Sequence, residues 1–146
     1  MYLTQYTDYA LRVLIYTAVN SEKLVNISTI AETYGISKSH LMKVVTALVK
    51  AGFLESVRGK GGGLRLGRAA EEIRIGEVVR ELEPCQIVEC MGSNGQCLIT
   101  PCCRLAGVLN GALQQFLQHL DGYTLADLMN QPLRDKLIES PIKMME

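Results

Sequence analysis

Apolar residues recur at helical spacing in three segments of the first fifty residues. Intervals of three and four place such residues on one face of a helix, so the first segment predicts a helix over about Thr4–Asn20. A second helix is expected to be capped by Ser28 and ended by Gly35, and a third to begin at the cap Ser37 and end at Lys50. The apolar face of the first helix consists of Ala10, Leu11, Leu14, Ile15 and Ala18.

The pattern changes after Gly52. Two short strand-like runs, Phe53–Val57 and Leu64–Leu66, are joined by the glycine-rich sequence RGKGGG, which predicts a hairpin. Three further helices are predicted over Ile73–Leu82, over about Arg104–Leu120, and as a short docking helix from near Thr124. The segment that opens at Pro84 is too rich in Gly, Pro and Cys for regular structure. The expected fold is mainly α with a small β-hairpin.

The second and third helices have the layout of a helix-turn-helix. In ISTIAETYGISKSHLMKVV the small Ala31 lies where the helices would cross, and Gly35 lies in the turn. Apolar Ile36, Leu41 and Val44 would hold the second of the two helices in place. Alone, this pattern also fits a plain helical hairpin. The basic, glycine-rich hairpin that follows favours a winged helix-turn-helix.

The formal net charge of zero averages two unlike halves. Residues 1–68 contain nine basic and four acidic residues, a balance of +5, and residues 69–146 contain six and eleven, a balance of −5. A positive N-terminal half is typical of a module that binds a polyanion, although uneven solvated charge gives the same count.

Double-stranded promoter DNA is the expected polyanion. The start of the third helix would present backbone N–H groups, the positive end of the helix dipole and short polar side chains. This makes it the candidate recognition helix, and the hairpin the candidate wing, whose other interpretation is a solvated loop. The candidate DNA-binding residues are Ser37, Lys38, Ser39, His40 and Lys43 on the helix and Arg58, Lys60 and Arg65 on the hairpin.

Five cysteines fall between positions 85 and 103. The N-terminus lacks the pattern of a signal peptide and no apolar run is long enough to span a membrane, so a reducing cytoplasm is expected and a disulfide framework is not. Clustered thiolates suit zinc or an iron–sulfur cluster, and an alternative hypothesis is that the thiols sense a signal by being oxidised directly. No pair has the two-residue gap of zinc knuckles, so the spacing favours a cluster.

Four segments, MYLTQYTDYALRVLIY, VRGKGGGLRLG, IRIGEVVRELEP and CLITPCCRL, resemble the NsrR-type nitric-oxide-sensitive repressors of the Rrf2 family. The resemblance spans nearly the whole chain. It implies a homodimeric repressor whose cluster is nitrosylated by nitric oxide, after which the protein releases DNA. It also implies a 4Fe-4S rather than a 2Fe-2S cluster, with Cys90, Cys97 and Cys103 as ligands. Six and five residues separate these ligands.

The same resemblance implies a fourth ligand, Asp8, donated by the opposite subunit. The family's regulator of iron–sulfur biogenesis uses a histidine at the position of Ala106, so that form of ligation is excluded here. Without the resemblance, Asp8 is a first-turn acid that stabilises a helix N-terminus. Cys85 and Cys102 fall outside the ligand pattern and are interpreted as packing thiols.

The long helix after the cysteines has an apolar stripe that could pack within the chain or between subunits. The resemblance and the two-fold symmetry of a palindromic operator favour a dimerisation helix.

An enzyme is not expected, because neither histidine lies in an acid–base or nucleophile arrangement, and a basic wing argues against an electron carrier. The expected division is a winged-helix domain over 1–83, an iron–sulfur loop over 84–103, the dimerisation helix and docking segment over 104–139, and a tail over 140–146.

Overall fold

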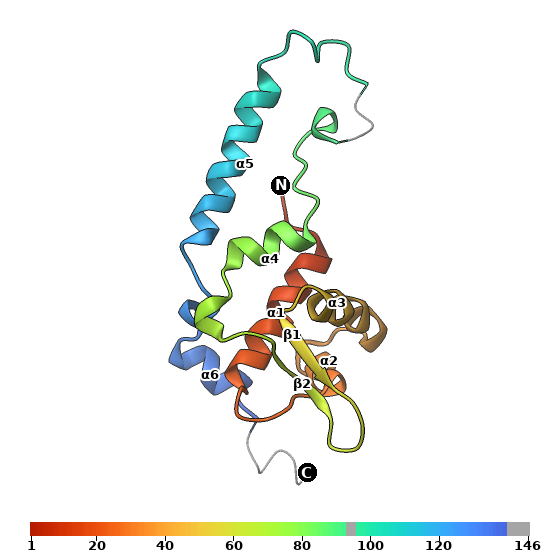
Figure 1. Cartoon of the computed structure of the whole chain (residues 1–146), viewed down its shortest axis with the longest axis vertical. Coiled ribbons are helices and arrows are strands. Elements are labelled where there is room, and N and C mark those ends of the chain that lie inside the picture. The colour runs from red at the N-terminus through yellow and green to blue at the C-terminus, as the bar shows by residue number, and fades with distance from the viewer. Residues whose placement is uncertain (93–95, 140–146) are drawn as a thin grey trace.

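The computed structural model describes residues 1–92 and 96–139. They form a mainly helical fold with one two-stranded antiparallel sheet (Figure 1), as predicted. The elements in chain order are α1 (Gln5–Val19), α2 (Ile27–Tyr34), α3 (Lys38–Lys50), β1 (Leu54–Val57), β2 (Gly63–Leu66), the 3-10 turn η1 (Ala70–Glu72), α4 (Ile75–Leu82), η2 (Glu89–Met91), α5 (Leu105–Asp121), η3 (Ala126–Leu128) and α6 (Gln131–Leu137).

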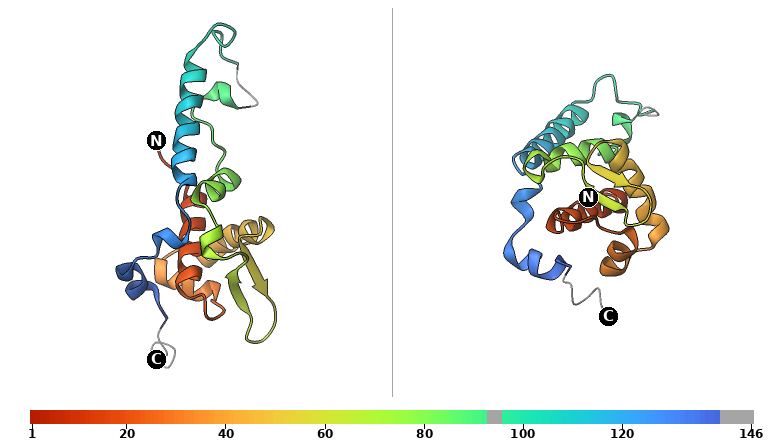
Figure 2. Two further views of the ribbon diagram at one scale, coloured as in Figure 1. Left: turned by 60° about the vertical axis from the view of Figure 1, so that its left-hand side comes forward. Right: turned by 60° about the horizontal axis from the view of Figure 1, so that its bottom comes forward.

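The core is built around α1. This helix contacts α3, β2, α4 and α6, and in the right-hand view of Figure 2 it lies at the centre with the other helices of the body around it. Its side chains Ala10, Val13 and Leu14 are completely buried, as are Leu41 and Val44 of α3. The elements around α1 bury their apolar side chains against it, which stabilises the fold. The orientation of the DNA-binding helices therefore depends on their packing against α1.

Gly35 ends α2 as predicted, in the left-handed conformation with φ of 68°. The cap of α1, for which no residue was predicted, is Thr4, whose side chain accepts from the backbone N–H of Thr7. The predicted cap Ser28 is wrong: the side chain of Asn26 accepts from the backbone N–H of Ser28 at 2.8 Å, so α2 begins two residues earlier than predicted.

Two helix boundaries in the second half differ from those predicted. The fourth helix begins at Ile75 rather than Ile73, because Ile73 accepts a backbone hydrogen bond from Leu125 at 2.8 Å and extends alongside it. The docking segment is not one helix from Thr124; it divides into η3 and α6, and Pro132 lies in the first turn of α6. The expected tail, 140–146, lies outside the described residues.

Helix α5 extends away from the body, together with the segment that contains the five cysteines, residues 84–92 and 96–104, which we call the cysteine segment (Figures 1 and 2). Only its C-terminal half packs firmly, where Leu117 joins Ile75 and Val79 in a second apolar cluster. A side chain at Gly76 would collide with the Asp121 carboxylate, and the guanidinium of Arg80 donates hydrogen bonds to the same carboxylate. Helices α4 and α5 therefore meet closely at one end.

The end of the described chain is fastened to the C-terminal end of α1. The buried amide of Asn20 donates to the carbonyl oxygen of Leu137 at 3.0 Å and accepts from the backbone N–H of Glu139 at 2.8 Å. The Glu139 carboxylate also accepts from the Tyr16 hydroxyl and pairs with Lys23. Burial, followed by the Glu139 carboxylate, raises the pKa of Tyr16, so its hydroxyl stays a donor at neutral pH.

Replacing Asn20 by Ala is expected to lower the free energy of unfolding by about 1–3 kcal/mol, because the backbone groups of Leu137 and Glu139 lose their partner. For a chain of this size each kcal/mol corresponds to roughly 2–4 °C in Tm, which thermal denaturation followed by circular dichroism resolves. Gln5→Ala, which removes an exposed amide from the same helix, is the matched control. Equal melting curves for the two variants would contradict this account of the C-terminal segment.

Candidate functional site

Helices α2 and α3 form a helix-turn-helix. The turn is closed by a hydrogen bond from the backbone N–H of Ile36 to the carbonyl oxygen of Ala31 at 3.0 Å. Ser37 then caps α3 by accepting from the backbone N–H of His40 at 3.3 Å. Leu41 and Val44 are buried against the rest of the domain, so the opposite face of α3 is left open to solvent.

That open face carries most of the predicted helix residues. Lys38, Ser39 and Lys43 are exposed, and Met42, which the sequence analysis did not single out, is 51% exposed among them. His40 is placed differently. Its ring is half-buried and meets the ring of Tyr9 edge-on, with centroids 5.2 Å apart, so it contacts α1.

Strands β1 and β2 form the hairpin of the predicted wing. Its tip is turned by Gly59 and Gly61, whose φ angles of 98° and 78° favour glycine. Arg58 and Lys60 lie exposed at this tip. Arg65 lies on β2 opposite Glu55, and the two make a salt bridge of 3.0 Å that lowers the pKa of the carboxyl.

A groove of about 340 Å³ separates the hairpin from α3. Lys38 and Met42 line it on the helix side, Ser56 and Val57 on the strand side, and Asn26 at the start of α2. The candidate nucleic-acid interface is therefore a continuous surface from the exposed face of α3 to the tip of the hairpin. Sequence spacing could indicate its charges but not the position of Met42.

The cysteine segment begins at the end of α4. Cys90, in η2, and Cys103, just before α5, are half-buried, whereas Cys97 and Cys102 are exposed. All five thiols are free. Among residues 1–92 and 96–139, the single chain brings no three His, Cys, Asp or Glu side chains together around a possible metal position. The predicted ligands therefore do not converge within this one chain.

The chemistry of the three predicted thiol donors nevertheless fits an iron–sulfur cluster. They are soft donors in one irregular segment, and their side chains form no disulfide and are not fully buried. Cys102, which was interpreted as a packing thiol, is instead exposed, and it donates a weak hydrogen bond to the carbonyl oxygen of Ile99 at 3.5 Å.

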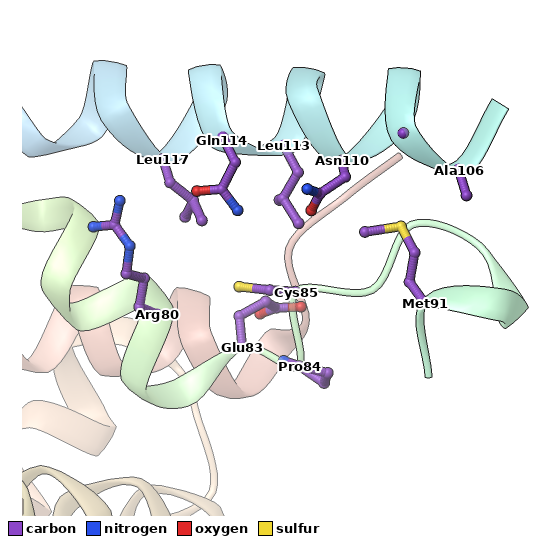
Figure 3. A pocket seen from close by; sticks show the side chains of 11 residues that line it. Arg80, Glu83, Pro84, Cys85, Met91, Ala106, Asn110, Leu113, Gln114 and Leu117 are labelled. Atoms are coloured by element: carbon purple, nitrogen blue, oxygen red, sulfur yellow. The ribbon is translucent and has the colours of Figure 1, made fainter. Parts of the chain in front are cut away.

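Cys85 lies in a different setting. It belongs to the lining of a cavity of about 630 Å³ between α4, α5 and the cysteine segment (Figure 3). Burial raises the pKa of its thiol, and the nearby Glu83 carboxylate raises it further. A thiol that holds its proton is a poor metal ligand, which agrees with the interpretation of Cys85 as a packing residue.

Asp8 lies on the first turn of α1, and its side chain is 45% exposed. It pairs with Arg12 one turn later at 2.9 Å. The guanidinium of Arg12 lies over the rings of Tyr9 and Tyr34, at 5.6 and 5.8 Å from their centroids. Tyr34 donates from its hydroxyl to the carbonyl oxygen of Arg12 at 3.0 Å, and burial raises the pKa of Tyr34 to about 12. Asp8 is thus linked by contacts to α2.

Comparison with known proteins gives a consistent result. A sequence model of the Rrf2 family, described as an iron-dependent transcriptional regulator, matches residues 3–131. The chain is similar to CymR, the global cysteine regulator of B. subtilis, with a TM-score of 0.69 and 28% identity over 88% of this chain and 95% of that one. It is also similar to IscR of T. potens, with a TM-score of 0.73 and 25% identity over 98% of this chain and 96% of that one. A third similar structure is CymR of Staphylococcus aureus, with a TM-score of 0.67 and 27% identity over 86% of this chain and 95% of that one. Within the described residues no helix is long and apolar enough to cross a membrane.

Replacing any one of Lys38, Lys43, Arg58 or Lys60 by Ala is expected to weaken binding to a labelled DNA duplex regardless of its sequence. Each lysine or arginine that contacts a phosphate contributes about one unit to the slope of log K against log salt, and its loss lowers the slope by that amount. Fluorescence anisotropy at several salt concentrations measures the slope. Lys136→Ala, which removes an exposed lysine of α6, is the control; an equal loss with this control would mean that the basic surface is not the binding face.

Proposed function

Because this chain belongs to the Rrf2 family of transcriptional regulators, we propose that it is a cytoplasmic, homodimeric repressor that senses nitric oxide. It holds an iron–sulfur cluster through Cys90, Cys97, Cys103 and Asp8. In the loaded form it binds promoter DNA through α3 and the hairpin. Nitric oxide, acting at the cluster, lowers that affinity.

The observation that carries the proposal is the state of the cysteine segment. Cys90, Cys97 and Cys103 lie in one irregular stretch beside a DNA-binding domain, free of disulfides and not fully buried. Three thiolates suit iron, and a carboxylate as fourth ligand is a harder donor that leaves more readily. We favour a 4Fe-4S over a 2Fe-2S cluster. When bound, the cluster would supply an iron atom accessible to a diatomic ligand.

The contacts of Asp8 provide a path from the ligand set to the DNA-binding helices. A carboxylate that binds iron gives up part of its pairing with Arg12. Arg12 lies against Tyr9, and Tyr9 contacts His40 at the start of α3. His40 is accordingly a residue that positions the recognition helix, in addition to its predicted contact with DNA.

Helix α5 supports the proposed dimer. Leu105 and Val108, near its N-terminal end, are 58% and 65% exposed, although they belong to an apolar stripe. A second copy packed along this helix would cover them and would bring Asp8 of the partner subunit to the cysteines. It would also present two recognition helices to half-sites about one DNA turn apart.

Anaerobically purified protein is expected to show the absorbance of an iron–sulfur cluster, with iron and sulfide in matching amounts. Removal of the cluster or addition of nitric oxide is expected to weaken binding to a promoter fragment by about 5- to 150-fold, the usual range for coupled sites. Titration of a labelled promoter fragment, with absorbance recorded in parallel, measures both quantities. Ala at Cys90, Cys97 or Cys103 should abolish the cluster.

Cys102→Ala is the matched control, because it removes an exposed neighbouring thiol outside the proposed ligand set. It should retain the cluster and the response to nitric oxide. The proposal would be overturned by a colourless, zinc-containing protein whose DNA affinity does not change when nitric oxide is added. A protein without a cluster that loses DNA affinity on oxidation of its thiols would favour direct thiol sensing instead.

A further inference from the structure

The carboxylate of Glu83 receives hydrogen bonds from the start of α1. It accepts from the Thr4 backbone N–H at 3.2 and 3.3 Å, from the Thr4 hydroxyl at 3.0 Å, and from the Thr7 hydroxyl. Thr7 is completely buried and Glu83 is half-buried. A carboxylate at a helix N-terminus also interacts favourably with the helix dipole. We call Glu83, Thr4 and Thr7 the Glu83 clamp.

The clamp does more than cap a helix. Thr4 already caps α1, because its hydroxyl accepts from the backbone N–H of Thr7. The additional bonds reach 79 and 76 residues along the chain, to the residue that ends α4. Their structural effect is to hold the end of α4 on the first turn of α1.

The end of α4 is also where the cysteine segment begins. Pro84 restricts the backbone directly after Glu83, and Cys85 has a φ of 56°, a left-handed conformation that turns the chain sharply. The side chain of Cys85 packs into the cluster that contains Leu117 of α5. Figure 3 shows Glu83, Pro84 and Cys85 together beneath α5. The segment therefore leaves the body through a stiff base that is held on α1 by Glu83 and on α5 by Cys85.

Movement of this base would be transmitted to the recognition helix, α3. The first turn of α1 carries Thr7 and Asp8, the next residue is Tyr9, and Tyr9 contacts His40 of α3. Within a single chain, this gives a mechanical route from the cysteine segment to the DNA-binding surface, and it does not depend on the Asp8 carboxylate or on its pairing with Arg12.

We propose that Glu83 is a positioning residue that couples the state of the cysteine segment to α3 through the Glu83 clamp. This inference rests on the proposed function, since it concerns how cluster loading is sensed. Glu83 belongs neither to the proposed ligand set nor to the candidate DNA-binding surface. Its role is to make the first turn of α1 follow the base of the segment.

The test compares DNA affinity in cluster-loaded and cluster-free protein. In Glu83→Ala, the ratio of the two affinities is expected to fall at least about fivefold, the lower end of typical coupling. Iron and sulfide per chain and the affinity of the cluster-free form should stay within about twofold of wild type. Glu83→Gln keeps one oxygen as acceptor, so its ratio should be intermediate; it also serves if the Ala variant does not fold.

Glu81→Ala, which removes an exposed carboxylate two residues earlier, is the control for charge. If both Glu83 variants kept the wild-type ratio of loaded to cluster-free DNA affinity, the coupling role of the Glu83 clamp would be refuted. The proposed function would not be affected by that result. Equal loss of affinity in the loaded and cluster-free forms would also refute the coupling role, because that result indicates a structural role alone. A wild-type protein whose DNA affinity does not depend on the cluster would refute the clamp together with the proposed function.

Discussion

Helix α1 is buried by elements from both halves of the chain, and the rest of the structure is arranged on it. It contacts α3 and β2 of the DNA-binding surface, α4 at the base of the cysteine segment, and α6 near the end of the described chain. Burial of Ala10, Val13 and Leu14 makes these contacts apolar and close-packed. A close-packed helix cannot shift at one end without displacing its neighbours, so α1 is the element through which a distant event can reach α3.

The two ends of α1 differ in function. Its C-terminal end is joined to the last described residues by Asn20 and Tyr16, which stabilises the domain. Its N-terminal end meets the proposed sensing apparatus twice: through Asp8, proposed to bind the partner's cluster, and through Thr7, which is bonded to Glu83. In the proposed dimer, the first connection would report on the opposite subunit and the second on the same subunit. Together they would make α1 a junction between both cysteine segments and one recognition helix.

The amino-acid sequence predicts the helices and strands better than it predicts where they begin and end. Periodic apolar residues identified the main helices, because one face of each is buried, and Gly35 and Ser37 were recognisable by their local chemistry. The cap of α2 was predicted at Ser28 and lies at Asn26; both residue types can cap a helix, and only the backbone geometry distinguishes them. The start of α4 depends on pairing of Ile73 with distant Leu125, and the Glu83 clamp spans more than seventy residues. No local pattern carries such information. The proposed ligands rest on the family resemblance, and within the described residues a single chain does not bring them together.

The most direct test of the account asks whether Asp8 serves the cluster of the opposite subunit. Heterodimers are prepared with Asp8→Ala and Cys97→Ala either on opposite subunits or on the same subunit, and absorbance and nitric oxide titration are recorded. With the changes on opposite subunits, the Asp8→Ala chain keeps its cysteines and receives Asp8 from its partner, so one site per dimer should have the wild-type spectrum and response. With both changes on one subunit, no wild-type site should form. The reverse result, a wild-type site only when both changes share a subunit, would contradict the proposed link between subunits.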